Sequence, residues 1–347
     1  MFVLCVLSLF WLTISASTLI KSRHPVSPTF LILPGFGNDQ IDYVNPLGKG
    51  EEVGMVANLQ KRGYRAEVLP IRRFEWLKLL GGAVRDPRGF SSYDMTPQVF
   101  YQFYLDRIES KINEMINRDT EDRDIILLCH SAGGWLGRAF LGENSLSEDK
   151  QSKIKGLVTM GSPHYSPEDK MKDATRGSLR YVAEKYTASV LQQERPYLFI
   201  TSIAGTAVSS DLTAERGSRE FYANDAYLAV TGESINARKG DGVVPLDMAL
   251  LEGTKKITLK GVYHSIEAPE NQWYGGDNVL DMWLPAVMAQ YQKMQKTSKN
   301  GGGLGLANLE LAPVIENVLG DKLMKAGVVS IGIVPYVLFF FKFIANQ

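Results

Sequence analysis

The segment from residue 125 to residue 135 limits what this chain can fold into more than any other. An apolar run rich in branched residues (IILLC) stops abruptly, a serine follows between small residues, and a helical pattern then begins. This order of strand, tight turn and helix is typical of a nucleophile elbow, in which the serine hydroxyl projects from the apex of the turn. The crowded turn needs small residues two places before and after Ser131, and these are Cys129 and Gly133. Because cysteine replaces the usual glycine, the segment alone leaves open a serine that only caps a helix.

Strand and helix patterns alternate along the body of the chain. Helix patterns cover 53–62, closed by Gly63, and a long segment that starts at Thr96, the expected N-cap, with Pro97 at the first helical position. Short apolar strand patterns cover 29–33, 64–71, 125–129, 155–160, 197–204 and 256–263. This alternation predicts the α/β class, with a mostly parallel central sheet and helices on both faces.

Two stretches, 72–95 and 165–195, interrupt the alternation of strands and helices. The first mixes large apolar residues with arginines, and the second is rich in charge. Each is expected either to cover the mouth of a site as a lid or to be plain surface structure.

The overall composition excludes some classes of partner. The chain has 347 residues, with 38 Lys and Arg against 38 Asp and Glu, so no basic surface for a nucleic acid is indicated. The two cysteines, Cys5 and Cys129, lie in a leader-like segment and in the elbow, which argues against a structural disulfide. Since no His, Cys or carboxylate cluster has ligand spacing, neither a metal nor a cofactor is expected.

Both ends of the chain are apolar and predict association with a membrane. Residues 1–24 form a hydrophobic leader, interpreted as a signal peptide or an uncleaved anchor, with a buried N-terminal helix as the alternative. A folded domain is predicted for 25–296, followed by a glycine-rich linker at 297–303. The tail, 304–347, contains an uncharged stretch between lysines and is interpreted as membrane-seeking. The alternative for the tail is a helix docked on its own domain.

A serine nucleophile needs a base, and the four histidines allow a choice by elimination. In sheets that carry this elbow, the serine, the acid and the histidine follow in that chain order, with the histidine after the last strand. His264 fits this position. His24 precedes the first strand, His130 is expected to point away from Ser131, and His164 comes too early and is interpreted as structural.

The acid must lie between the serine and the base in the chain. Asp241, between two glycines, is expected to orient the ring of His264 and to stabilise its charged form. Asp211 is the first competitor and Asp247 the second, and for each of the three the alternative is a turn aspartate without a catalytic role.

An oxyanion hole needs two backbone N–H groups. One is expected from Ala132, directly after the serine. The other is expected from the glycine-rich turn after the first strand, with Phe36 as the first choice and Gly37 as the second.

Six motifs together resemble a known family. They are HSAGGWLGR at 130–138, GSPH at 161–164, TRGSL at 175–179, GDGVVP at 240–245, GVYHS at 261–265 and WYGG at 273–276. Between residues 28 and 285 the chain is similar to the lipase-like α/β-hydrolases of plants, algae and cyanobacteria, which are distantly similar to GPI inositol-deacylases. The resemblance implies an α/β-hydrolase fold with a catalytic triad, and it indicates an organelle, a plastid or the endoplasmic reticulum.

The function predicted from these features is hydrolysis of an acyl ester, such as an acyl lipid of a membrane, through an acyl-enzyme. Ser131, Asp241 and His264 form the expected triad. Acyl transfer or thioester hydrolysis by the same triad is the first alternative. The second is an inactive hydrolase-fold subunit of a membrane complex.

Overall fold

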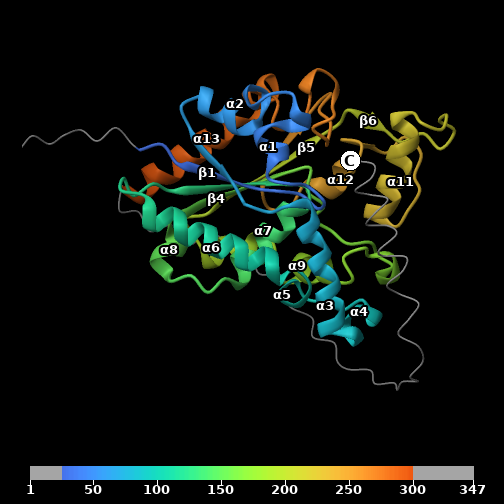
Figure 1. Ribbon diagram of the computed structural model, residues 1–347, viewed down its shortest axis with the longest axis horizontal. Coiled ribbons are helices and arrows are strands. Elements are labelled where there is room, and N and C mark those ends of the chain that lie inside the picture. The colour runs from blue at the N-terminus through green and yellow to red at the C-terminus, as the bar shows by residue number, and fades with distance from the viewer. Residues whose placement is uncertain (1–25, 300–347) are drawn as a thin grey trace, which may run out of the picture.

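The computed structural model describes residues 26–299 (Figure 1). The predicted leader at 1–24, His24 and the predicted tail at 304–347 lie outside these residues. Helix α13 (Asp277–Lys299) continues three residues into the segment predicted as a linker. Across residues 26–299, every helix is too short or too polar to cross a membrane.

A six-stranded parallel sheet forms the centre of the molecule, in the order β2-β1-β3-β4-β5-β8. Its strands are β1 (Thr29–Leu33), β2 (Arg65–Val68), β3 (Ile125–His130), β4 (Ile154–Met160), β5 (Phe199–Gly205) and β8 (Lys255–Leu259). A separate antiparallel pair is formed by β6 (Val208–Ser209) and β7 (Lys239–Gly240). Because all six main strands run the same way, their carboxyl ends meet at one edge, which is where the loops after the strands gather.

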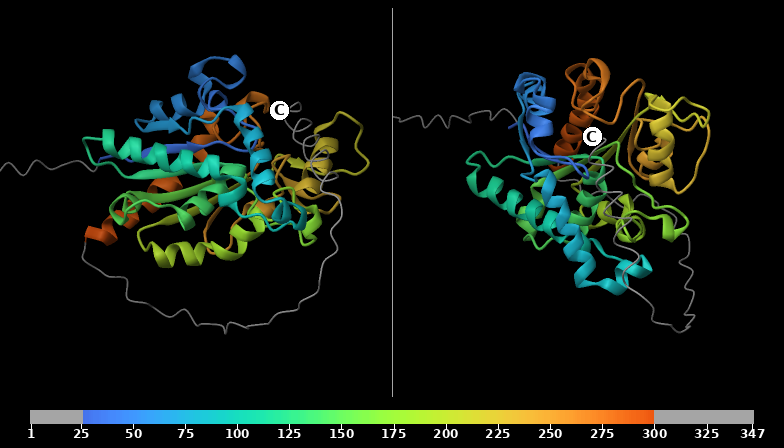
Figure 2. Two further views of the ribbon diagram at one scale, coloured as in Figure 1. Left: turned by 60° about the horizontal axis from the view of Figure 1, so that its bottom comes forward. Right: turned by 45° about the vertical axis from the view of Figure 1, so that its right-hand side comes forward.

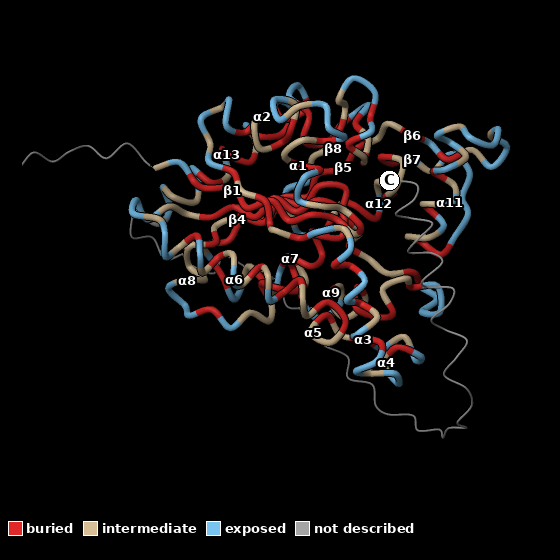
Figure 3. The backbone as a smooth tube through the Cα atoms, viewed as in Figure 1, coloured by how far each residue is buried: buried red, intermediate tan, exposed pale blue. Residues whose placement is uncertain are grey.

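Each face of the sheet is covered by helices, as both views in Figure 2 show. Side chains alternate along a strand, so Leu31 and Leu127 belong to one apolar cluster while Phe30 and Ile126 belong to the other. The strands are therefore buried on both sides and form the red centre of Figure 3. The predicted α/β class with helices on both faces is confirmed.

Most helices belong to one of the two apolar clusters, one on each face of the central sheet. The first cluster includes residues of α3 (Leu79–Arg85), α4 (Pro87–Ser92), α5 (Pro97–Phe100), α6 (Gln102–Arg118), α7 (Ala132–Glu143), α9 (Ser178–Lys185) and α10 (Ala188–Glu194). The second includes residues of α1 (Ile41–Val44), α2 (Met55–Lys61) and α13. The remaining helices are α8 (Glu148–Ser152), α11 (Arg219–Thr231), α12 (Leu246–Ala249), and the 3₁₀ turns η1 (Pro46–Gly48), η2 (Glu51–Val53), η3 (Arg73–Lys78), η4 (Lys170–Lys172) and η5 (Pro269–Asn271).

The long helix predicted from Thr96 differs from the expectation in two ways. Thr96 takes the N-cap position, but its side chain makes no capping hydrogen bond, because the Val99 N–H donates to the Thr96 carbonyl at 3.2 Å. The helix also breaks at Tyr101, where φ is −113° and ψ is 20°. At this break the ring of Tyr101 packs edge-on against the ring of Trp135, with 4.8 Å between the ring centres.

Two predicted strands are shorter than expected. The pattern at 64–71 forms a strand only over Arg65–Val68, since Pro70 has no N–H to continue the ladder. The pattern at 256–263 ends at Leu259, because Gly261 adopts φ +73° and turns the chain. Early termination of this last strand places residue 264 on a loop at the carboxyl edge.

The two stretches that interrupt the alternation pack against each other. Arg176 of the second stretch lies over the rings of Phe90 and Tyr93 of the first, at 4.4 and 4.3 Å from the ring centres. The Met95 N–H also donates to the carbonyl of Arg176 at 2.8 Å. The two stretches therefore form one unit next to the sheet, and their role as a lid stays a prediction.

Arg138 of α7 joins this unit to the core. It is fully buried and pairs with no carboxylate within residues 26–299. Its guanidinium donates to the carbonyls of Tyr186 and Val182, at the carboxyl end of α9, at 2.7 and 3.1 Å. The negative end of the helix dipole favours a cation at this place. Burial lowers the pKa of Arg138 to about 10, which still leaves it charged at neutral pH.

We expect Arg138→Met to destabilise the protein, because the Tyr186 carbonyl loses its buried donor, whereas the Val182 carbonyl keeps the Tyr186 N–H. The expected loss is about 1–3 kcal/mol for the carbonyl left unpaired, measured by urea unfolding. The control is Arg118→Met, which removes a mostly exposed arginine that pairs with Glu67 and Glu114 at the surface and should cost about 0–1 kcal/mol. Equal losses in the two variants would contradict this account of Arg138.

Candidate active site

Ser131 lies at the turn between β3 and α7 in a strained backbone conformation. Its φ is +53° and its ψ is −128°, a region that side-chain-bearing residues rarely adopt. The turn is held by the Ser131 N–H, which donates to the Met160 carbonyl at 2.9 Å. The serine side chain makes no capping hydrogen bond to α7, so the alternative of a capping serine is wrong.

Small residues make this turn possible. A Cβ added to Gly133 would lie 2.4 Å from the Leu33 carbonyl oxygen, so β1 and the start of α7 could not approach as they do. The sulfur of Cys129 is accommodated because it faces Gly137, where an added Cβ would lie 3.1 Å from it. Burial raises the pKa of Cys129 well above its usual range, so this thiol stays protonated.

Asp241 and His264 form a buried pair at the same edge of the sheet. His264 Nδ1 lies 2.8 Å from Asp241 Oδ2, and both residues are almost completely buried. The other carboxylate oxygen accepts the backbone N–H groups of Val243 and Val244 at 3.0 and 2.8 Å. Because Nδ1 faces a carboxylate, Nε2 of His264 is the ring nitrogen left for proton transfer.

Tyr274 is a further partner of Asp241 that the sequence reasoning missed. Its hydroxyl donates to Asp241 Oδ2 at 2.7 Å and accepts the Gly205 N–H at 2.7 Å. Burial and the neighbouring carboxylate raise the pKa of Tyr274 well above its usual range, so the hydroxyl keeps its proton. The one available signal was its place in the WYGG motif.

The competing residues lie elsewhere. Asp211 is bound to Thr213 within its own exposed turn, and Asp247 pairs with Arg238. His164 is fully buried, with Nε2 at 2.9 Å from the Thr159 hydroxyl and Nδ1 facing Arg138. Neither competing aspartate contacts His264 in the described part of the chain, and the position of His164 agrees with a structural role.

The serine and the histidine approach the same strand end. Ser131 is bonded to Met160, and the next residue, Gly161, is so close to the pair that an added Cβ would lie 2.9 Å from His264 Nδ1 and 2.4 Å from Asp241 Oδ2. Within residues 26–299 no hydrogen bond joins the Ser131 hydroxyl to His264. In free enzymes such a bond is often long and tightens with substrate, so the complete triad stays a prediction.

The turn expected to supply the oxyanion hole packs directly on the serine. A Cβ added to Gly35 would lie 2.6 Å from Ser131 Cβ and 3.2 Å from its hydroxyl. The turn is fixed by the Tyr104 hydroxyl, which donates to the Pro34 carbonyl at 2.6 Å, and by the ring of Phe36 against Trp76. Ala132 begins α7, where N–H groups have no partner within the helix. Phe36 and Ala132 thus remain the predicted donors.

His130 does not simply point away from the site. It is buried beside His264, with Nδ1 at 2.8 Å from the Tyr43 hydroxyl and Nε2 at 3.1 Å from the His264 carbonyl oxygen. Burial, together with the neighbouring His264, lowers the pKa of His130 well below its usual range.

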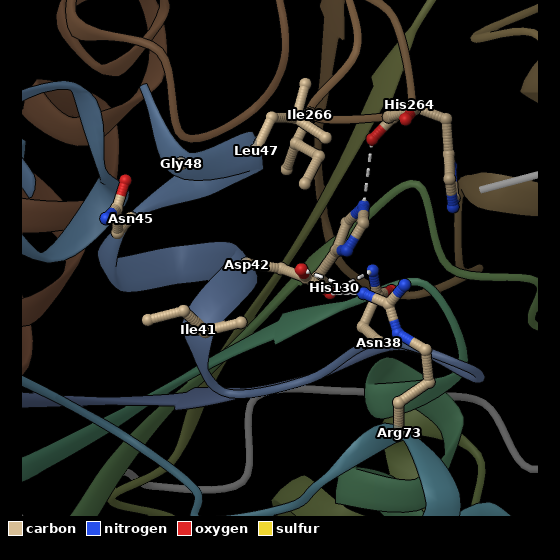
Figure 4. Close-up of a pocket in the computed structure, with 11 residues that line it drawn as sticks. Asn38, Ile41, Asp42, Asn45, Leu47, Gly48, Arg73, His130, His264 and Ile266 are labelled. Carbon is tan, nitrogen blue, oxygen red and sulfur yellow. Dashed lines mark hydrogen bonds and ion pairs between the residues drawn. The ribbon is translucent and has the colours of Figure 1, made fainter. Parts of the chain in front are cut away.

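A pocket of about 280 Å³ adjoins this histidine (Figure 4). His130, Asp42, Arg73 and Ile266 are among the residues that line it, but Ser131 is not. The pocket therefore reaches His264 itself as well as His130, but not Ser131. In residues 26–299 no group of three or more His, Cys, Asp or Glu side chains is arranged to hold a metal ion.

A serine on a strained strand-to-helix turn and an aspartate–histidine pair on later loops of the same parallel sheet define the α/β-hydrolase fold. A family model described as "PGAP1-like alpha/beta domain" matches residues 99–284, and the chain belongs to this lipase-like family. The plant, algal and cyanobacterial affinity expected from the motifs stays a prediction. No curated protein matches the sequence.

Solved structures with similar chains include lipase 1 from Pelosinus fermentans, with 12% identity, 77% of this chain and 98% of that chain covered, and a TM-score of 0.44. A metagenomic carboxyl esterase shares 12% identity over 76% of each chain, with a TM-score of 0.43. Phospholipase PlaB from Legionella pneumophila shares 12% identity, with 79% of this chain and 62% of that chain covered and a TM-score of 0.40. Similarity at this level assigns no activity to this chain.

We expect Gly35→Ala to slow the reaction of Ser131 with a fluorophosphonate probe by about 100-fold, the cost of a shift near 1 Å at a reacting group. The added methyl would push the 34–38 turn away from Ser131. The control is Gly81→Ala in α3, where an added Cβ meets nothing within 4 Å; it should leave the labelling rate unchanged. Unchanged labelling in Gly35→Ala would show that the turn plays no part in the reaction.

Proposed function

We propose that this protein is a serine esterase of the lipase type, which hydrolyses an acyl ester through an acyl-enzyme. The observation that carries the proposal is the buried Asp241–His264 hydrogen bond of 2.8 Å, on loops at the same sheet edge as the strained Ser131. A carboxylate bonded to Nδ1 selects the imidazole tautomer that a serine nucleophile needs.

In this mechanism Ser131 attacks the ester carbonyl while His264 Nε2 removes the serine proton. Asp241 keeps the ring oriented and stabilises the imidazolium that forms. The N–H groups of Phe36 and Ala132 stabilise the negative oxygen of the tetrahedral intermediate. His264 then protonates the departing alcohol, and a water molecule activated by the same histidine releases the acid.

We expect Ser131→Ala to abolish hydrolysis of short acyl esters and labelling by a fluorophosphonate probe, because no nucleophile remains. Mass spectrometry of the wild type should find the adduct on Ser131. Full esterase activity in Ser131→Ala would overturn the mechanism, and a wild type without an adduct would favour an inactive hydrolase-fold subunit.

Asp241→Asn provides a second arm of the same experiment with its own control. The amide cannot stabilise the imidazolium and favours the wrong tautomer, so kcat should fall by about 10⁴-fold. Asp211→Asn changes the competing aspartate, which is partly exposed and bonded to Thr213, and should leave kcat unchanged. The reverse ranking of these two variants would assign the acid to Asp211.

The substrate that we propose is an acyl lipid at a membrane surface, in an organelle such as a plastid or the endoplasmic reticulum. The membrane surface rests on the uncharged character of 1–20 and 326–341 in the sequence, since stretches of this kind partition into bilayers. The organelle rests on the resemblance of the sequence motifs to plant and algal proteins. The ester carbonyl would then reach the site from the bilayer.

We expect a protein without residues 304–347 to be released from membranes by milder treatment than the full chain, because one apolar segment is lost. The measurement compares salt, carbonate and detergent extraction of the two forms, with esterase activity confirming that the shortened form is folded. Equally firm binding of both forms would show that the tail is not an anchor.

A further inference from the structure

A chain of hydrogen bonds connects the oxyanion turn to the loop of the base. The Gly35 N–H donates to the Tyr43 hydroxyl at 3.2 Å, and this hydroxyl lies 2.8 Å from His130 Nδ1. On the other side of the ring, His130 Nε2 lies 3.1 Å from the His264 carbonyl oxygen. Tyr43 and His130 are separated by 87 residues in sequence, so the chain joins α1 to the end of β3.

The partners determine where each proton lies. The His264 carbonyl oxygen can only accept, so His130 Nε2 must carry a hydrogen. In a neutral imidazole Nδ1 is then an acceptor, and it accepts a hydrogen bond from the Tyr43 hydroxyl. That hydroxyl has one proton and lone pairs, so it accepts the Gly35 N–H at the same time. Every donor is matched with an acceptor, and this leaves one consistent arrangement from Gly35 to His264.

Both ends of this chain lie directly next to the reacting groups. Gly35 touches Ser131 and precedes Phe36, the predicted oxyanion donor. At the other end, the bonded carbonyl belongs to the base itself, and the N–H of the same residue donates to the Asp241 carbonyl oxygen at 2.9 Å. The backbone of His264 is therefore held on both sides, by Asp241 and by His130.

Burial makes these bonds strong constraints. Tyr43 is fully buried and His130 is 2% exposed, so both are largely shielded from water. The two histidine rings lie 4.7 Å apart, and the rings of Trp273 and Tyr274 also contact His130. A buried polar group that loses its partner costs free energy. This series of hydrogen bonds therefore resists any movement of the turn relative to the base.

We propose that Tyr43 and His130 are positioning residues. They hold the oxyanion turn and the base in a fixed position relative to each other, on either side of Ser131. His130 precedes the nucleophile in the elbow, yet it acts through Gly35 and His264 and does not touch the reacting atoms. The inference rests on the proposed serine mechanism, because it assigns these residues a role in that reaction only.

The test compares variants that separate hydrogen bonding from shape. His130→Gln introduces an amide that can still donate to the His264 carbonyl. His130→Met places a side chain of similar length there that can make neither hydrogen bond. Tyr43→Phe removes one oxygen. We expect His130→Met and Tyr43→Phe to lower kcat on a short acyl ester by about 10- to 100-fold, as small misplacements do, with KM changed less than about twofold. His130→Gln should restore most of kcat relative to His130→Met.

A double-variant cycle then asks whether the two residues act as one unit. Tyr43→Phe added to His130→Met should lower kcat little further, since the chain is already broken. The matched control is Tyr291→Phe, another buried tyrosine, whose hydroxyl donates to Asp124 far from the site; its kcat should equal that of the wild type. Circular dichroism melts confirm that each variant is folded at the assay temperature.

Each result bears on the inference. Wild-type kcat in both single variants, additive losses in the double variant, or losses that follow only the loss of folded protein would overturn it. The proposed function fails differently, through a wild type whose Ser131 takes no fluorophosphonate adduct. An adduct on Ser131 together with unchanged kcat in Tyr43→Phe and His130→Met would retain the esterase and reject the positioning role.

Discussion

The buried carboxylate of Asp241 is the interaction on which the rest of the site depends. It accepts from four donors: His264 Nδ1, the Tyr274 hydroxyl and the N–H groups of Val243 and Val244. A charged group at 2% exposure is tolerable only when its oxygens are bonded in this way. The same bonds fix the tautomer and the direction of the His264 ring, so the electrostatic requirement of burial and the geometric requirement of a base are met together.

The parallel sheet makes this arrangement possible. Ser131 follows β3, and Gly161 follows β4 and lies beside the Asp241–His264 pair. β8 ends at Leu259, so His264 lies on the loop after it. No single strand of these three positions all the residues of the site. Their common direction brings the loops after them to one edge, where hydrogen bonds of Tyr43 and His130 connect Gly35 to the backbone of His264.

Much of the fold and part of the site could be predicted from the sequence because their signals are local. The apolar runs that form β1 and β3 are visible as such, and the small residues around Ser131 mark the turn. Other features could not be predicted. The sequence predicts that the Thr96 side chain caps the helix, but the Val99 N–H donates to the backbone carbonyl of Thr96 instead. The break at Tyr101 arises because its ring packs on Trp135, a contact that no local pattern reveals.

The sequence by itself determined the α/β class, the strand–turn–helix at Ser131 and the chain order of Ser131, Asp241 and His264, since these depend on periodicity, residue size and spacing. Only the tertiary structure decided that Asp241 and not Asp211 contacts His264, that Tyr274 shares the carboxylate of Asp241, and that His130 faces the His264 carbonyl. Such pairings are made between residues far apart in the chain, and a hydrogen bond depends on distance and direction in space, which the order of residues does not specify.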